Sequence, residues 1–400
     1  MLCSAALLAT AAVAAAQDAD QQKTIERLEK RLEALEKEKK PEKGGNAAEL
    51  ADPVEEKWYD RVKVGGGVRT TFRSVEDAAA HDGYSKDFAL ESGRIYMTGK
   101  ITDIVSAEFN TEFTADSDGV DEQPVRILDA LAKFKFKDEL QVWLGRFLPP
   151  SDRANLDGPY YLATWDFPLV QAYPAKFAGR DDGVAVWGEF DKGRYRYQVG
   201  LFEGRDNVDG DADHLEISGR FVVSLLDPEA GYYTSSTYYG EKEILTAAFV
   251  FFFQPDVEGT PLEEEDFLGF SLDVLFEKKF DGFVVTGEFA FYSYDRGEFA
   301  GEGTGVLLLG AVLLPYEVGW GKFQPHVRFQ TFDSDADPIN VAATGNTDVE
   351  RWDFGVNYVI AGHNLRISAV YTIQDNDTED VAVETRDVSH SFVLGTQFQF

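Results

Sequence analysis

The feature that most constrains the fold of this chain is an alternation of apolar and polar residues, repeated in segments of about ten residues. A period of two is that of a β-strand with one apolar and one polar face. About ten residues is also the length that a tilted strand needs to cross a bilayer. Sixteen segments of this kind predict strands at 62–73, 92–101, 104–113, 126–136, 139–147, 182–190, 193–202, 215–224, 244–253, 267–276, 283–294, 305–316, 320–332, 350–360, 364–374 and 389–400.

The last segment ends on Phe400, as the final strand of a bacterial outer-membrane β-barrel does. If this strand finishes in the periplasm, every odd-to-even connection lies outside and should be long, and the other connections should be short. Nearly all connections comply, and the tight turns at 102–103 and 191–192 are examples. The exception is 225–243, where either a strand is misassigned or a long turn folds back over the rim.

The segments before the strands indicate export. Residues 1–16 are apolar, end in small residues and are typical of a signal peptide, although no Lys or Arg precedes the apolar run. Residues 17–43 carry leucines at heptad spacing and predict a short periplasmic coiled coil, with a solvated, partly helical leader as the alternative. Residues 44–60 are expected to be a linker, and residues 61–400 a barrel. The net charge of −33 argues against nucleic-acid binding.

The alternation also predicts which side chains face the lumen. With Trp352, Phe354 and Val356 facing lipid, Arg351 and Asp353 face inward. Extending this register gives a basic set of pore-lining candidates, a pattern that favours anions. A balanced wall, in which charges pair across adjacent strands, is the alternative. The candidates are Arg69, Arg94, Lys133, Lys135, Arg146, Arg196, Arg220, Lys322, Arg328 and Arg366.

The longest connection, 148–181, is the third outer loop by this count. A loop of this length in a compact domain is usually functional. We expect it to fold into the barrel and narrow it, with Arg153, Lys176 and Arg180 facing the remaining opening. The alternative places the loop across the outer mouth or in subunit contacts.

Several motifs resemble those of the phosphate-selective porin (O and P type) family. They are the run Val142-Trp143-Leu144-Gly145-Arg146-Phe147-Leu148-Pro149-Pro150 before the long loop, Asp182-Gly183-Val184 after it, Asp227-Pro228-Glu229-Ala230-Gly231-Tyr232-Tyr233, and the terminal Phe400. The resemblance implies a trimeric, sixteen-stranded outer-membrane channel for small anions. The acidic outer loops would repel phosphate at the mouth, so phosphate selectivity itself is not carried over.

The sequence therefore predicts an all-β chain, a sixteen-stranded antiparallel transmembrane β-barrel preceded by a short coiled-coil helix. The predicted function is an outer-membrane porin for passive diffusion of small hydrophilic solutes, with anions such as phosphate preferred. The expected partners are the bilayer, small anionic or neutral solutes and two further copies in a homotrimer, with no cofactor, metal or catalytic residue. A general non-selective or cation-tolerant porin, anchored by its coiled coil, is the alternative.

Two further functions fit the sequence less well than the pore does. An enzyme would need a nucleophile beside a base, and none of the five histidines lies next to a serine in a recognisable motif. The acidic run 206–213 could suit calcium, but it lacks the twelfth-position glutamate of an EF-hand, which favours a solvated loop.

Overall fold

The structure is a computed structural model that describes residues 61–76, 83–113, 125–171, 179–205, 214–260, 263–296, 302–335, 347–378 and 388–400. One compact unit extends from Lys57 to Phe400. The predicted signal peptide, coiled coil and linker, and the acidic run 206–213, lie outside the described residues.

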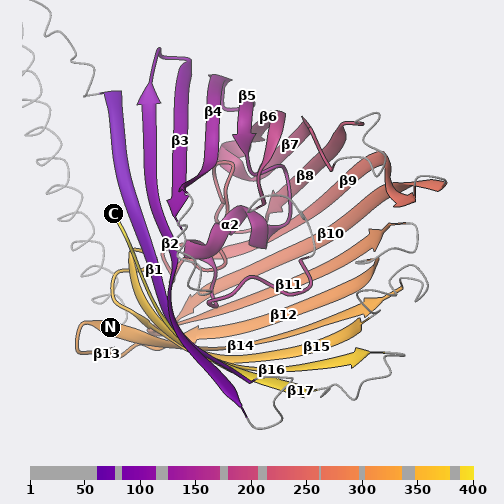
Figure 1. Cartoon of the computed structure of the whole chain (residues 1–400). Coiled ribbons are helices and arrows are strands. Elements are labelled where there is room, and N and C mark those ends of the chain that lie inside the picture. The colour runs from indigo at the N-terminus through magenta and orange to yellow at the C-terminus, as the bar shows by residue number, and fades with distance from the viewer. Residues whose placement is uncertain are drawn as a thin grey trace, which may run out of the picture. The chain divides into compact units, whose positions relative to one another are not determined.

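The compact unit is a closed antiparallel β-barrel of sixteen long strands (Figure 1). All sixteen predicted strands are present, and a two-residue strand, β13, is added in the connection before β14. The strands are β1 (Val62–Glu76), β2 (Tyr84–Lys100), β3 (Val105–Phe113), β4 (Val125–Lys137), β5 (Leu140–Phe147), β6 (Asp181–Phe190), β7 (Tyr195–Phe202), β8 (Glu216–Ser224), β9 (Ile244–Thr260), β10 (Glu263–Phe280), β11 (Phe283–Asp295), β12 (Gly303–Leu313), β13 (Glu317–Val318), β14 (Gly321–Ser334), β15 (Thr347–Val359), β16 (Leu365–Thr378) and β17 (Val388–Gln399).

The barrel closes between its first and last strands. β1 pairs with β17 over nine residue pairs, from Gly67 opposite Gln399 to Val75 opposite Ser391. The terminal residue extends this ladder, because the Phe400 N–H donates to the Gly66 carbonyl at 2.9 Å and the Phe400 carbonyl accepts from the Gly66 N–H at 3.1 Å. A closed sheet leaves no unpaired edge, which is the condition for strands to cross a bilayer.

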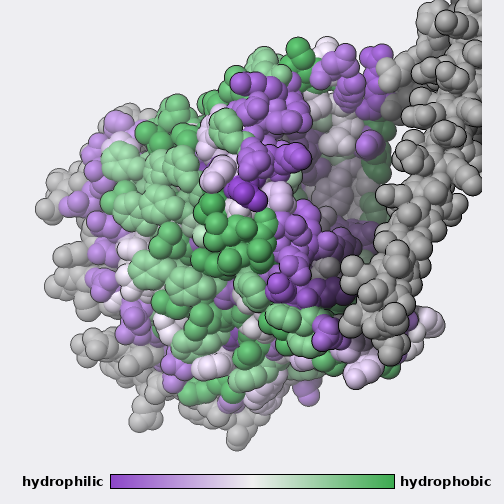
Figure 2. Space-filling model, turned by 180° about the vertical axis from the view of Figure 1, so that it is seen from behind, coloured by the Kyte–Doolittle hydropathy of each residue, from purple (hydrophilic) through white to green (hydrophobic). Residues whose placement is uncertain are grey.

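The predicted register holds on the strands for which it was argued. Trp352, Phe354 and Val356 on β15 are 37%, 47% and 36% exposed, whereas Asp353 and Asn357 between them are fully buried. The same contrast recurs on β7, β14 and β16. Figure 2 shows the result as a broad hydrophobic area on the outer surface of the barrel. On these four strands the apolar side chains thus face outward, while the polar ones face the lumen.

Three strands extend well beyond their predicted bounds, because their hairpins continue past the apolar band. β2 begins at Tyr84, and β9 and β10 pair as far as Thr260 and Glu263. The acidic run 263–266, expected in an outer loop, therefore belongs to β10. Backbone pairing extends there without an apolar face, so the alternation of residue types does not report it.

The turn 225–243 resolves the exception in the predicted loop pattern. β8 and β9 pair directly with each other on either side of it, so no strand is missing. Several of its side chains are buried against the inner wall, Glu229, Tyr232 and Thr237 among them. The second alternative is therefore the correct one: this long turn folds back, and it does so into the lumen. We call residues 225–243 the folded-back turn.

Candidate channel and its constriction

The long loop 148–180 enters the barrel, as predicted. Its helix α2 (Arg153–Tyr161) lies inside the ring of strands (Figure 1). The Asp152 side chain caps the helix by accepting from the Asn155 N–H, which satisfies one of the first-turn donors. Residues 148–160 of the loop are buried throughout. No helix in the described part of the chain is long and apolar enough to cross a membrane.

An apolar inner wall on β9–β12 receives the tip of the loop. Ala163 and Val170 pack in one cluster with wall residues that include Phe252, Tyr292 and Leu307. Gly305 makes room for Val170, because a Cβ at that position would lie 3.0 Å from the valine Cβ. Side chains of the loop tip and of the wall therefore fill this part of the lumen.

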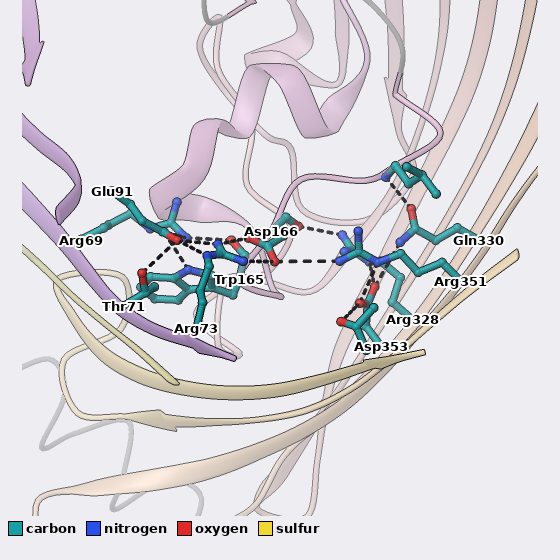
Figure 3. Close-up of polar contacts among 12 residues, drawn as sticks. Arg69, Thr71, Arg73, Glu91, Trp165, Asp166, Arg328, Gln330, Arg351 and Asp353 are labelled. Atoms are coloured by element: carbon teal, nitrogen blue, oxygen red, sulfur yellow. Dashed lines mark hydrogen bonds and ion pairs between the residues drawn. The ribbon is translucent and has the colours of Figure 1, made fainter. Parts of the chain in front are cut away.

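The tip of the loop is also clamped by charge across the barrel (Figure 3). Asp166 accepts from Arg73 of β1 through both carboxylate oxygens, at 2.6 and 3.1 Å. The Arg351 guanidinium of β15 lies 3.9 Å from the same carboxylate, and Arg328 of β14 donates to the Asp166 carbonyl at 2.9 Å. One loop residue thus ties together strands on both sides of the barrel closure.

Trp165 anchors the neighbouring position. Its side chain is fully buried beside Val370 and Val393, and its indole N–H donates to Glu91 at 2.8 Å. Arg69 donates to the Trp165 carbonyl at 2.7 Å (Figure 3). Gly395 is required here, since a Cβ on it would lie 2.5 Å from the indole.

The folded-back turn forms the second half of the constriction. Tyr232 stacks on Trp143 of β5, with ring centroids 4.3 Å apart, and contacts Trp187 of β6 edge-on. Further along, Thr237 donates to Glu277 of β10 at 2.7 Å. These contacts hold the turn against two separate parts of the wall.

Buried charges join the loop, the turn and the wall. Arg153 of α2 donates to both carboxylate oxygens of Glu229 at 2.8 and 2.7 Å, and to the Ser235 carbonyl at 2.9 Å. Its Nε also lies 3.5 Å from Asp273 of β10, which accepts from Arg220 of β8. Burial alone would raise the pKa of Glu229, but Arg153 outweighs this effect and holds the pKa at about 2.

His363, in the turn between β15 and β16, contacts both inserted segments. Its Nδ1 lies 3.2 Å from the Tyr160 carbonyl of α2, and its Nε2 lies 2.8 Å from the Thr237 carbonyl of the folded-back turn. The ring also packs against Tyr161 and Tyr239, at 4.8 Å each. Burial, with a further contribution from the charge of Arg366, lowers the pKa of His363 to about 4.

The open space lies on the other side of the barrel. A cavity of about 790 Å³ runs along the inner faces of β1–β4 and is bounded opposite them by α2 and the folded-back turn. Five basic side chains contribute to its lining: Lys63, Arg94, Lys133, Arg180 and Lys242. Arg94 pairs with Glu112, Lys133 with Glu108, and Arg180 with Asp129.

The two remaining cavity lysines differ from these pairs. Within the described residues neither Lys63 nor Lys242 forms an ion pair; Lys242 donates to the Pro228 carbonyl at 3.4 Å and lies over the Tyr238 ring. Asp157 of α2 also lines the cavity. Burial raises the pKa of Asp157 well above its usual range in spite of the nearby Arg153. Even with Asp157 counted as charged, the five basic side chains of the lining outnumber the three acidic ones, Glu108, Asp129 and Asp157.

Most of the predicted pore-lining cations are buried side chains of the barrel wall rather than exposed groups. Those with at most 9% of the residue exposed are Arg69, Arg94, Arg196, Arg220, Arg328 and Arg366. Lys135 is exposed and pairs with Asp138 at 2.8 Å, and Lys322 is half-buried. Of the constriction-loop candidates, Arg153 is 1% exposed and Arg180 8%, while Lys176 lies outside the described residues. Arg94, Arg220 and Arg328 pair with carboxylates of the wall. Arg196 and Arg366 instead donate to backbone carbonyls of the folded-back turn and of the long loop.

Arg146 lies on the opposite face from the one predicted. On β5 the inward positions are those of Trp143 and Phe147, which pack against Tyr232, so Arg146 faces outward with Leu144. The rule that apolar residues face lipid gives the wrong face here, because the folded-back turn supplies an apolar surface inside the barrel.

The sequence reasoning did not single out several residues that build the constriction. Glu229, Trp165 and Glu277 are examples, and Glu229 entered only as part of a family motif. Gly395 carried a signal, because it places a glycine at an inward position of an otherwise regular strand.

The closed sixteen-stranded barrel, its inserted third loop and its polar cavity define an outer-membrane porin.

The family is established by comparison. The family model described as phosphate-selective porin O and P matches residues 62–235 and 277–400, and the chain belongs to this family. Its fold and family are those of a channel of the bacterial outer membrane. No curated protein sequence matches the chain.

Solved structures show the same fold at low sequence identity. The anion-selective porin from Comamonas acidovorans aligns with a TM-score of 0.55 at 13% identity, over 85% of this chain and 99% of that one. Pseudomonas putida OprB in its high-pH structure gives 0.59 at 11%, over 86% and 95%. The trimer form of in-vitro folded Vibrio cholerae OmpT gives 0.50 at 14%, over 85% and 99%.

Proposed function

We propose that this porin passes small hydrophilic solutes by passive diffusion and prefers anions, phosphate among them. The observation that carries the preference is the cavity along β1–β4, where Lys63 and Lys242 add positive charge beyond the paired residues. In a narrow passage with low-dielectric walls, a net charge of one sign concentrates the opposite ion. The family description and the anion-selective porin among the structural neighbours agree with this preference.

The acidic residues of the chain do not oppose this proposal at the constriction. Although the whole chain has a net charge of −33, the cavity carboxylates Glu108 and Asp129 are each held by a basic partner. Selectivity is set where the passage is narrow and screening by salt is weakest. The lysines of the cavity, rather than the total charge, should therefore decide which ion is favoured.

A second candidate is a general porin with no strong preference, or one that tolerates cations. It is favoured by the three ion pairs in the cavity wall, Arg94–Glu112, Lys133–Glu108 and Arg180–Asp129, because paired charges present little net field to a solute. The two candidates differ in the effect of removing the unpaired lysines. In the general porin, these lysines would have no influence on the choice of ion.

The assembly that we propose is a homotrimer in the outer membrane. The trimer form of OmpT has this fold, and most homo-oligomers have closed symmetry, which a ring of three copies satisfies. Residues 1–16 are proposed to direct export, and the coiled coil of residues 17–43 to add contacts between the three chains in the periplasm. Insertion of a trimer into a planar bilayer should raise the conductance in groups of three equal levels.

The experiment is a measurement of reversal potential in a salt gradient across a planar bilayer. The wild-type channel should show an anion-selective potential, and Lys63→Gln/Lys242→Gln should shift it toward zero or toward cations. The matched control is Lys86→Gln/Lys192→Gln, which removes two exposed charges that do not line the cavity. An equal shift in both double variants, or none in either, would favour the general porin, and absence of channels would refute the porin function.

A further inference from the structure

Five tyrosines line the cavity along β1–β4 together with its basic side chains: Tyr96, Tyr160, Tyr161, Tyr233 and Tyr238. They come from both sides of the cavity, because the first belongs to β2 of the wall and the others to α2 and the folded-back turn. The cavity volume of about 790 Å³ lies within the range of about 300–1,000 Å³ that is typical of sites for small organic molecules. Inorganic phosphate has no apolar surface to place against a ring, so an anion preference alone leaves these rings without a role.

On the wall side of the cavity, a lysine and a tyrosine are neighbours on the inner face of the sheet. The half-buried Tyr96 of β2 is the cross-strand partner of Gly65 of β1, and Lys63 precedes Gly65 by two residues. Residues two apart on a strand share a face, so Lys63 is the diagonal neighbour of Tyr96. Gly65 leaves the ring uncovered, and no larger residue fits there, since a Cβ would lie 2.6 Å from the Phe400 carbonyl oxygen.

The opposite side of the cavity has the same combination of a lysine and a tyrosine. Lys242 of the folded-back turn lies over the Tyr238 ring, with its Nζ 5.0 Å from the ring centroid. The Tyr238 hydroxyl donates to Glu229 at 2.6 Å, which fixes the orientation of the ring. Tyr161 at the end of α2 is 40% exposed, and its ring packs against His363 with the centroids 4.8 Å apart. Each side of the cavity therefore holds a tyrosine ring beside a lysine that forms no ion pair among the described residues.

We propose that this cavity is a weak binding site for aromatic carboxylates, and that the channel favours them over inorganic phosphate. The proposal rests on the anion preference of the proposed function and names the solute class of the same passage. The carboxylate would pair with Lys63 or Lys242, while the attached ring stacks on the tyrosine beside that lysine, an arrangement in which aromatic pairs attract each other. The other three cations of the lining are already held by carboxylates, so few charged donors remain for the compact charge of phosphate. The binding is weak because a conducting site must also release its solute.

The site is tested by adding benzoate to single channels of the full chain in planar bilayers bathed in potassium chloride. Benzoate bound in the cavity should obstruct the chloride current, and its titration gives the concentration of half-maximal block. Acetate supplies the same charge without a ring, and inorganic phosphate supplies the competing solute. Half-maximal block by benzoate is expected at a concentration about tenfold below that of acetate or phosphate, as a stacking contribution of about 1.4 kcal/mol gives.

Variants separate the contribution of the rings from that of the charges. Tyr96→Leu/Tyr161→Leu removes one ring from each side, and it should raise the half-blocking concentration of benzoate about fivefold and leave that of acetate unchanged. The matched control is Tyr371→Leu on β16, whose side chain faces outward and is 42% exposed, against 40% for Tyr161. This control should retain the block of the wild type. Lys63→Gln/Lys242→Gln should weaken the block by benzoate and by acetate alike.

The proposal is overturned if benzoate blocks the wild-type channel at no lower concentration than acetate and phosphate do, a comparison that needs no variant to fold. Stronger block by glucose 6-phosphate than by benzoate would also overturn it, because the rings would then serve a sugar. Reversal potentials in potassium chloride are recorded on the same channels. Anion-selective channels that do not distinguish benzoate from acetate would reject the aromatic site alone, whereas channels without anion preference would reject the preference on which it rests.

Discussion

The constriction depends on one buried arginine, and we predict that Arg153→Met loosens both inserted segments. Arg153 is 1% exposed and joins α2 to Glu229 of the folded-back turn and to Asp273 of the wall. Methionine keeps most of the side-chain volume but removes the charge and all donors. Asp273 retains Arg220, whereas the Glu229 carboxylate retains the Tyr238 hydroxyl, at 2.6 Å, as its side-chain donor within the described residues.

The size of the destabilisation depends on how the Glu229 carboxylate responds to the loss of Arg153. Removing one partner of a buried ion pair costs about 3–5 kcal/mol, because a buried charge is left uncompensated. Glu229 can avoid this uncompensated charge by taking up a proton. From an ordinary pKa of 4.5, protonation at pH 7 costs about 3.4 kcal/mol, since each pKa unit corresponds to about 1.36 kcal/mol. We therefore expect a loss of about 3–4 kcal/mol in the free energy of unfolding at pH 7.

This origin gives the loss a characteristic pH dependence. In the wild type, the Glu229 pKa of about 2 lies below its unfolded value of 4.5, so the stabilisation is fully present above pH 4.5. In the variant, the free energy needed to protonate Glu229 decreases as the pH falls toward 4.5. The difference between variant and wild type should narrow by about 2.7 kcal/mol from pH 7 to pH 5, which is two units of pH.

The assay is reversible urea unfolding from lipid vesicles at both pH values, with single-channel recording of the same samples. Lys278→Met is the control, because it breaks a half-exposed pair with Glu243 at 3.4 Å and should cost at most about 1 kcal/mol. The variant channel should also show higher conductance and more current noise. A loss no larger than that of the control, or one that does not change with pH, would refute the reasoning.

Further predictions concern two other anchors. His363 has a lowered pKa of about 4, so the unfolded chain binds the extra proton first as the pH falls below about 6.5. The free energy of unfolding should therefore fall by up to about 3 kcal/mol between pH 6.5 and pH 4, and His363→Gln should lose this dependence in the same urea titrations. Trp165→Ala removes a fully buried side chain and should cost about 3–5 kcal/mol and raise the conductance. Phe167→Ala, which truncates a side chain that is 40% exposed, should leave the conductance unchanged in the same recordings.

Much of the barrel was predictable, because its dominant constraint acts on every strand. Lipid requires apolar outward positions, and this places Trp352 and Phe354 outside and Asp353 inside without further information. The hairpin extensions of β9 and β10 were missed for the same reason. Beyond the bilayer no face needs to be apolar, and the run 263–266 carries no alternation to read.

The constriction was predictable only in outline. Loop length placed 148–181 inside the barrel, but its partners come from residues far apart in sequence, such as Arg153 with Glu229 and Asp166 with Arg73. The hardest positions to predict were those on β5, where the apolar side chains face the lumen and Arg146 faces outward. Trp143 on β5 faces inward because the folded-back turn supplies Tyr232, and no local pattern on β5 records that partner.

The inward arginines and the selectivity of the pore are therefore separate matters. Arg220 and Arg328 each donate to a buried carboxylate and to the backbone of the inserted loop, so their charges are compensated and far from free water. Neutralising such a residue should reduce stability and disturb the constriction, with the ion preference changing only as a consequence. Lys63 and Lys242 should behave in the opposite way, since losing them breaks no ion pair among the described residues. Arginines such as Arg220 and Arg328 thus hold the inserted loop in the lumen, whereas Lys63 and Lys242 line the cavity without an ion pair among the described residues.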